Sequence, residues 1–185
     1  MKRIRTIVCV MWSLMLLTAC SSSDNDFSDA GVAKASQKLH AVARQSADAS
    51  FQYKAEMPLF SLNDVKSFNT KTGEMKFKNV KFDSHLFQDV GCKYRVYFYD
   101  GDDLLFDAVA VSWFSSVGYF DQLTFQCDVF GPDETWDISK SHFYLSYGYP
   151  GTISGDKSIE KLKQKNAAGM ERFIKILQQT GKIVN

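Results

Sequence analysis

The chain has 185 residues, of which 23% are charged and 45% hydrophobic, and its formal net charge is +1. This length is enough for one ordinary domain. A near-neutral chain has no general electrostatic attraction to nucleic acid or anionic lipid, so the charge argues against a nucleic-acid partner. Aromatic residues are the one compositional excess, at 14% of the chain.

The first 19 residues have the three parts of an export signal. Lys2, Arg3 and Arg5 form a charged region, 7–17 form an apolar region, and small residues precede Cys20. The apolar run is shorter than the ~20 residues that cross a bilayer. The sequence therefore predicts a cleaved signal peptide at 1–19 and not a membrane-spanning helix.

The signal ends in Leu17-Thr18-Ala19-Cys20, which resembles the lipobox of bacterial lipoproteins. In that family a peptidase cuts before the cysteine, which then becomes lipidated. The resemblance implies a membrane anchor at Cys20, where several acyl chains hold more firmly than the marginal binding of one. Removal of the three leader cations lowers the formal net charge from +1 to −2. An ordinary secretory signal with a chance cysteine is the alternative.

The residues after Cys20 are polar and predict a flexible tether. The segment 21–26 contains only Ser, Asp and Asn, so no side chain of it can enter a core. It resembles the serine-and-acidic tags of surface-exposed lipoproteins from gram-negative anaerobes. This likeness implies the outer membrane and leaves open its periplasmic or cell-surface face. A solvated linker that carries no localisation signal explains the same residues.

The segment 27–54 is rich in Ala, Ser, Gln and Asp and has few large apolar residues. Alanine favours helix, but the apolar stripe is thin, so we expect a weak helical stalk. The expected backbone conformation changes at Met57-Pro58, because the residue before proline favours extended geometry. We therefore place the tether and stalk at 20–56 and a single domain at 57–185.

Local patterns predict the elements of this domain. Ser61 can cap a short helix over 61–68. Asp100-Gly101 between β-rich segments predicts a hairpin turn. Alternating or continuous apolar residues predict the strands. The expected strands are 74–78, 92–99, 104–111, 122–129 and 142–147.

The C-terminal region changes to a helical period. Its large apolar residues recur at three-, four- and eight-residue steps, from about Ser154 or Asp156 to a stop at Gly181. They are Ile159, Leu162, Met170, Phe173, Ile174 and Leu177. The predicted fold class is therefore α+β. We expect an antiparallel β-meander of four to six strands, a short N-terminal helix, and a long C-terminal helix packed on one face.

The segment 58–79 resembles a stretch of small, uncharacterised lipoproteins of gut-type gram-negative anaerobes. The shared pattern is F-N-x-x-T-x-E-x-x-F-K-N, which starts here at Phe68, and the closing helix ends similarly in T-G-K. That group carries no assigned activity. The resemblance implies a fold and an outer-membrane or surface location, and it transfers no functional residue.

Besides Cys20, the mature chain has two cysteines, Cys92 and Cys127, both on the inward phase of expected strands. An exported protein meets an oxidising space. A disulfide would close a loop of ~35 residues and stabilise the fold by about 3–4 kcal/mol in the chain-entropy model. Two separate buried thiols are the alternative.

No motif in the sequence identifies a reaction. His40, His85 and His142 are isolated, and zinc-protease, nucleophile-elbow and phosphate-loop patterns are absent. The acidic residues of 100–107 lack the other ligands of a calcium loop, and a hairpin turn explains them. We therefore expect no metal and no cofactor, and we favour a protein that is not an enzyme while leaving that question open. A small hydrolase, or an enzyme inhibitor, that uses His85 or His142 with nearby carboxylates is the rival.

Aromatic residues gather in and beside the loops between the later strands. Such rings offer a large rigid area with a polar edge, which is typical of binding sites. Packing in a core short of aliphatic residues is the alternative for each of them. The candidate ligand-binding aromatics are Trp113, Phe114, Tyr119, Trp136 and Tyr149.

The hypothesis from the sequence is a lipid-anchored envelope protein that presents a compact binding domain. Its expected partners are the membrane, through Cys20, and another envelope protein or a glycan. If the partner is a glycan, the protein is a carbohydrate-binding surface lipoprotein. A structural spacer is a third possibility. An interaction protein needs an exposed aromatic patch, whereas an enzyme needs a pocket in which titratable groups converge. Burial of Trp113, Trp136 and Tyr149 together would remove the aromatic platform.

Overall fold

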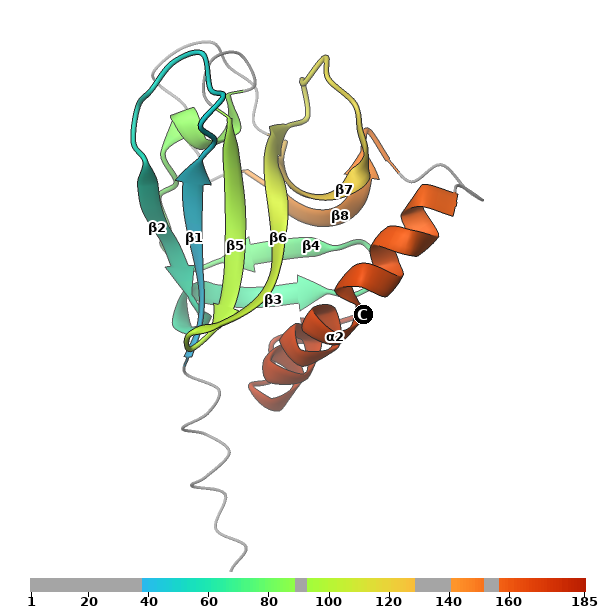
Figure 1. The fold of residues 1–185 in the computed structure, drawn as a ribbon. Helices are drawn as coiled ribbons and strands as arrows, with labels where there is room; N and C mark the ends of the chain where they lie inside the picture. The colour runs from blue at the N-terminus through green and yellow to red at the C-terminus, as the bar shows by residue number, and fades with distance from the viewer. Residues whose placement is uncertain (1–37, 89–92, 129–140, 152–156) are drawn as a thin grey trace, which may run out of the picture.

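A computed structural model describes residues 38–88, 93–128, 141–151 and 157–185. In these residues nine strands form one sheet, and a long helix lies in the chain between the eighth and ninth strands (Figure 1). The strands are β1 (Leu39–Gln45), β2 (Glu56–Ser61), β3 (Val65–Asn69), β4 (Glu74–Phe77), β5 (Tyr94–Asp100), β6 (Asp103–Ser112), β7 (Tyr119–Cys127), β8 (Phe143–Tyr149) and β9 (Ile183–Val184). The helices are η2 (Leu62–Asp64), η3 (Ser84–Phe87) and α2 (Lys157–Gln179).

The sheet is mixed and strongly curled. Its strand order is β2-β1-β5-β6-β7-β8-β4-β3-β9, with β6–β7 and β3–β9 parallel and the other pairs antiparallel. Figure 1 shows β3 and β4 crossing β1, β2, β5 and β6 at a steep angle. The rings of Phe60 on β2 and Phe77 on β4 lie 4.7 Å apart between centroids, although five strands separate β2 from β4 in the sheet. The sheet therefore closes around its own concave face.

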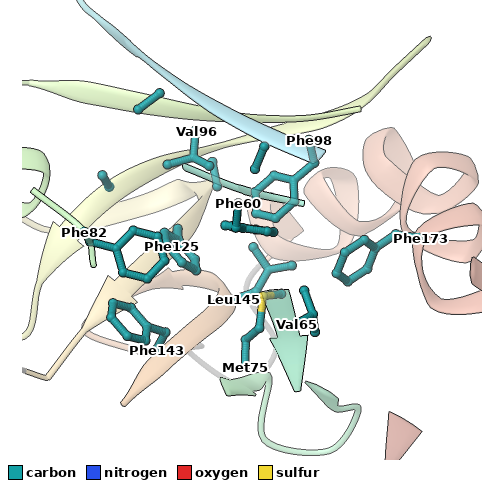
Figure 2. Packing of buried hydrophobic residues seen from close by; sticks show 14 of the residues in the cluster. Phe60, Val65, Met75, Phe82, Val96, Phe98, Phe125, Phe143, Leu145 and Phe173 are labelled. Atoms are coloured by element: carbon teal, nitrogen blue, oxygen red, sulfur yellow. The ribbon is translucent and has the colours of Figure 1, made fainter. Parts of the chain in front are cut away.

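Phenylalanine fills much of this concave face (Figure 2). Phe125 on β7 is completely buried. Its ring lies 5.8–6.4 Å from those of Phe60, Phe77, Phe82, Phe87, Phe98 and Phe143. Tilted and edge-to-face pairs at such separations add about 0.5–1.5 kcal/mol each beyond the burial of area. Much of the aromatic excess in the sequence is therefore core.

Helix α2 packs on β6, β7 and β8. Phe173 is completely buried, and its ring centroid lies 5.4 Å from those of Phe68 and Phe106. Ile159, Leu162, Phe173 and Leu177 are the buried members of the periodic set from which the helix was predicted. The amphipathic helix is confirmed, and its apolar stripe completes the core.

The predicted fold class is wrong. The protein is strand-rich, with a nine-stranded mixed sheet in the described residues instead of a meander of four to six strands. The short N-terminal helix over 61–68 is also wrong. Asp64 accepts hydrogen bonds from the Ser61 N–H and Oγ–H at 2.7 and 2.8 Å, but these bonds hold only the turn of η2. At Val65 the chain becomes extended, because β-branched Val65 is fully buried in a strand that pairs with β4.

Strand β1 was also missed, since 39–45 fell within the expected helical stalk. β1 pairs with both β2 and β5, and Leu39, Ala41 and Ala43 are buried. The alternation of these residues is a strand period, but alanine gives it little hydrophobic contrast. Pairing on both edges overrides the helix propensity of alanine. The helical stalk is therefore wrong for 39–45, and residues 20–37 lie outside the described part of the chain.

The later strands match the sequence patterns more closely. β4, β5, β6, β7 and β8 occur within a few residues of the predicted bounds. The Asp-Gly turn joins β5 to β6, and Gly101 has the positive φ, +63°, that such a turn requires. The chain does not continue as a meander after β6, because residues 113–118 carry it out of the sheet before β7 pairs parallel to β6.

Gly169 tests the packing of α2 on the sheet. A Cβ at this position would overlap the carbonyl oxygen of Leu105 on β6. Gly169→Ala should therefore lower the free energy of unfolding by about 1–3 kcal/mol through overpacking. If Gly169 had no contact with the sheet, the substitution should instead raise the free energy of unfolding by about 1 kcal/mol, because alanine favours helix over glycine. Urea unfolding distinguishes the two, and a more stable variant would contradict this packing.

Candidate functional site

Residues 113–118 and the first two residues of β7 form a connection that we name the 113–120 arch. Trp113, Phe114, Val117 and Phe120 are exposed by 49%, 56%, 50% and 44%. They are four of the eight exposed large hydrophobic side chains in the described residues. Figure 1 shows the arch projecting beyond the end of β6. A concentration of exposed apolar side chains marks an interaction site.

Tyr149 supports the arch from β8. Its side chain is 6% exposed, and its hydroxyl donates hydrogen bonds to the carbonyl oxygens of Trp113 at 2.5 Å and Ser115 at 3.3 Å. The ring belongs to a small apolar cluster separate from the main core. This cluster consists of Val109, Val111 and Tyr149, with Tyr119 packed against it. The arch is therefore held to the sheet by this cluster and by the hydrogen bonds of Tyr149.

Serine side chains fix the local shape of the arch. The Phe114 N–H donates to Ser112 Oγ at 3.3 Å, and the Val117 N–H donates to Ser115 Oγ at 3.1 Å. The Trp113 N–H donates to the Cys127 carbonyl at 2.9 Å. Such side-chain bonds to nearby backbone groups stabilise a turn. The exposed apolar side chains are thus carried by a backbone with defined hydrogen bonds.

The predicted aromatic residues divide into three groups. Trp113 and Phe114 are exposed, and the Trp113 ring stacks on Tyr144 with centroids 5.5 Å apart. Tyr119 is partly buried, and buried Tyr149 serves the fold by supporting the arch. Trp136 lies outside the described residues. The exposure of Trp113 keeps an aromatic platform available.

A hollow of about 370 Å³ lies beside the arch. Val117 and Tyr119 of the arch line it, together with Lys93 and Arg95 at the start of β5. Its remaining lining residues are Ser46, Asp48, Gln88, Tyr94, Val109, Ala110 and Gln122. This volume falls in the range of small-ligand sites, roughly 300–1,000 Å³.

The charged groups of the hollow are paired. Arg95 donates from Nε to Asp107 at 2.6 Å and from Nη1 to the Gln122 amide oxygen at 2.7 Å. Lys93 donates to Asp48 at 3.0 Å. Hydrogen bonds from Ser46 and then Lys93 hold the pKa of Asp48 below its ordinary value. The charges of the lining are consequently balanced.

Sequence reasoning did not single out Lys93, Arg95 or Gln122. Arg95 and Gln122 both occupy outward positions in the alternation of their predicted strands, which is a signal that each is solvent-facing. They meet only because β6 lies between β5 and β7 in the sheet, and Gln122 reaches across it to Arg95. A strand order was needed before this cluster could be predicted.

Two histidines contact carboxylates, as the hydrolase hypothesis requires. His85 Nδ1 lies 2.9 Å from Asp83, and His142 Nδ1 lies 2.9 Å from Glu74. The His85 ring is stacked on Tyr53 with centroids 3.9 Å apart. In the part of the chain that the structure describes, neither histidine has a hydrogen bond to a Ser, Thr or Cys side chain. Among the described residues, these pairs therefore have no hydrogen-bonded nucleophile of the kind that a nucleophile and base arrangement requires.

The remaining sequence predictions concern the disulfide, the lipidation site and metal binding. Cys127 is buried, whereas Cys92 and Cys20 lie outside the described residues, so the disulfide and the lipidation remain predictions. Among the described residues, no group of three or more His, Cys, Asp and Glu side chains could hold a metal ion.

Comparison with protein-family models, curated proteins and solved structures gives no match for this chain. Within the described ranges, no helix is both long and apolar enough to cross a membrane.

Removal of the Tyr149 hydroxyl tests the support of the arch. Tyr149→Phe keeps the ring but leaves the Trp113 carbonyl without its donor, which should lower the free energy of unfolding by about 1–3 kcal/mol. Hydrogen exchange of the amides of 113–118 should accelerate. Tyr147→Phe on the same strand is the matched control. Unchanged exchange in the arch of Tyr149→Phe would contradict the supporting role.

The lowered pKa of the Asp83 carboxyl group should make the stability of the fold depend on pH. Burial raises the pKa of Asp83, but hydrogen bonds from His85 and Lys54 outweigh this effect and hold it at about 2, against an ordinary 3.8. A depressed carboxyl pKa stabilises the fold above the unfolded-state value, and the stabilisation disappears as pH falls toward the folded-state value. Asp83→Asn should therefore lose less unfolding free energy than the wild type between about pH 4 and pH 2.

Urea unfolding at several pH values measures this difference. Asp102→Asn, which replaces an exposed carboxylate of the β5–β6 turn, should keep the wild-type slope. Equal slopes for Asp83→Asn and the wild type would show that the Asp83 hydrogen bonds contribute nothing.

Proposed function

We propose that this protein is a lipid-anchored envelope protein that presents the 113–120 arch to another protein of the cell envelope. The observation that carries the proposal is the exposure of Trp113, Phe114, Val117 and Phe120 on a backbone held by Tyr149. The lipobox-like segment at Cys20 supports the anchor.

The position of the arch supports a partner located away from the membrane. The Gly101 N–H donates to the Lys38 carbonyl at 3.2 Å, so the chain enters the sheet beside the β5–β6 turn. β6 runs for ten residues from this turn to the arch, a length of roughly 33 Å. A tether that arrives at Lys38 therefore joins the domain at the end opposite the arch.

The chemistry of the arch favours a protein partner. Aromatic residues are enriched at the centres of protein interfaces, and a few of them carry most of the binding free energy. A backbone fixed by Tyr149 and by serine bonds loses little conformational freedom when a partner binds. The hydrolase alternative has no comparable support, because His85 and His142 each pair separately with one carboxylate.

The test compares the arch with an equivalent apolar residue elsewhere. The arch variant combines Trp113→Ser, Phe114→Ser and Phe120→Ser and retains Val117, which lines the hollow. Leu104→Ser is the control, since Leu104 is 52% exposed at the other end of β6. Chemical crosslinking in intact cells that make the full lipidated chain measures capture of the partner.

We expect the wild type and Leu104→Ser to capture the same envelope protein, with capture by the arch variant reduced at least tenfold. Loss of one aromatic hot-spot residue costs about 2 kcal/mol or more, and every 1.4 kcal/mol is tenfold in affinity. Cys20→Ala should leave the membrane fraction, while the arch variant should remain there. Equal capture by the arch variant and the wild type, when both are folded, would refute the proposal.

A further inference from the structure

We propose that the hollow beside the arch binds a neutral saccharide of one or two sugar units. This inference does not depend on the protein partner of the arch, because the two sites share only Val117 among the side chains that carry them. The hollow lies between the arch and the start of β5, where Lys93, Arg95 and Gln122 meet. Its volume of about 370 Å³ is at the small end of ligand sites, roughly 300–1,000 Å³, which limits the ligand to a small molecule or the end of a chain.

The donors of the hollow are preorganised. Three N–H groups of Arg95 are directed to Asp107 and Gln122, and a guanidinium carries five, so two remain for a ligand. Because the Gln122 oxygen accepts from Arg95, its amide nitrogen is the group left to donate. Ordered groups of this kind bind with little further loss of side-chain entropy.

The balance of charge selects against ionic ligands. An anion that approached Lys93 and Arg95 would also lie close to their carboxylate partners, Asp48 and Asp107, and a cation that approached Asp48 would lie close to Lys93. Either ion would have to compete with an internal ion pair. A hydroxyl group both donates and accepts hydrogen bonds, so it can use the Arg95 and Gln122 donors and the Asp48 acceptor without disturbing either pair.

The apolar part of the lining completes the match to a sugar. Val109, Ala110, Val117 and Tyr119 provide aliphatic and aromatic contact beside these polar groups. A sugar ring presents C–H groups on its faces and hydroxyl groups at its edge, which corresponds to this division. A wholly apolar ligand would bury the polar groups of Arg95 and Gln122 without partners, which is unfavourable.

The test measures binding calorimetrically with the full chain in a detergent that has no sugar headgroup. The probes are maltose, cellobiose and lactose as neutral disaccharides, with glucuronate and glucosamine as charged comparators. Soluble polysaccharides built from the same neutral sugars form a separate arm, which distinguishes a free sugar from the end of a glycan. The variants are Gln122→Ala and Arg95→Lys, and Gln178→Ala on the exposed face of α2 is the control.

We expect at least one neutral disaccharide or its polymer to bind, with affinity reduced at least tenfold in Gln122→Ala and Arg95→Lys and unchanged in Gln178→Ala. The variant with Trp113→Ser, Phe114→Ser and Phe120→Ser should still bind the sugar, which separates this result from the test of the arch. Binding of none of the neutral sugars, binding of the charged comparators alone, or undiminished binding by folded Gln122→Ala would overturn the proposal.

Discussion

The packing of phenylalanine rings around Phe125 is the interaction on which the rest of the structure depends. It brings β2 and β4 together across the concave face, as the Phe60 and Phe77 rings show, although these strands are far apart in the sheet. Once the sheet is curled in this way, α2 adds Phe173 to the same core. Residues 113–118 connect β6 to β7 outside the sheet and form most of the arch.

The arch and the hollow depend on a second, smaller packing unit. Tyr149 and its apolar neighbours on β6 hold the arch by a hydroxyl bond to the Trp113 carbonyl. The same segment places Val117 and Tyr119 beside Arg95, so one connection supplies both an exposed apolar surface and one wall of a polar hollow. The two proposed binding roles therefore share a backbone and Val117 but otherwise use different side chains, and substitutions can separate them.

Sequence patterns were sufficient to predict an element whose residue pattern depends on that element alone and not on its pairing with other strands. The Asp-Gly turn, the strands with alternating large residues and the period of α2 all belong to this class. The patterns failed where pairing decides the structure. Alternating Ala41 and Ala43 in β1 give little contrast, and Val65 follows a capped turn that is equally consistent with a helix. Trp113 and Phe114 were candidate binding residues from the sequence, with core packing as the alternative, and only the structure shows that they are exposed. The support from Tyr149 and the contact of Arg95 with Gln122 require the order β5-β6-β7-β8.

Site-specific photo-crosslinking in living cells determines whether the arch contacts an envelope partner. A photoreactive phenylalanine analogue replaces either Phe120 in the arch or Leu104 at the opposite end of β6, which are 44% and 52% exposed. We expect a covalent adduct with one envelope protein from position 120 and none from position 104. Adducts of equal yield from both positions, or none from position 120, would contradict it.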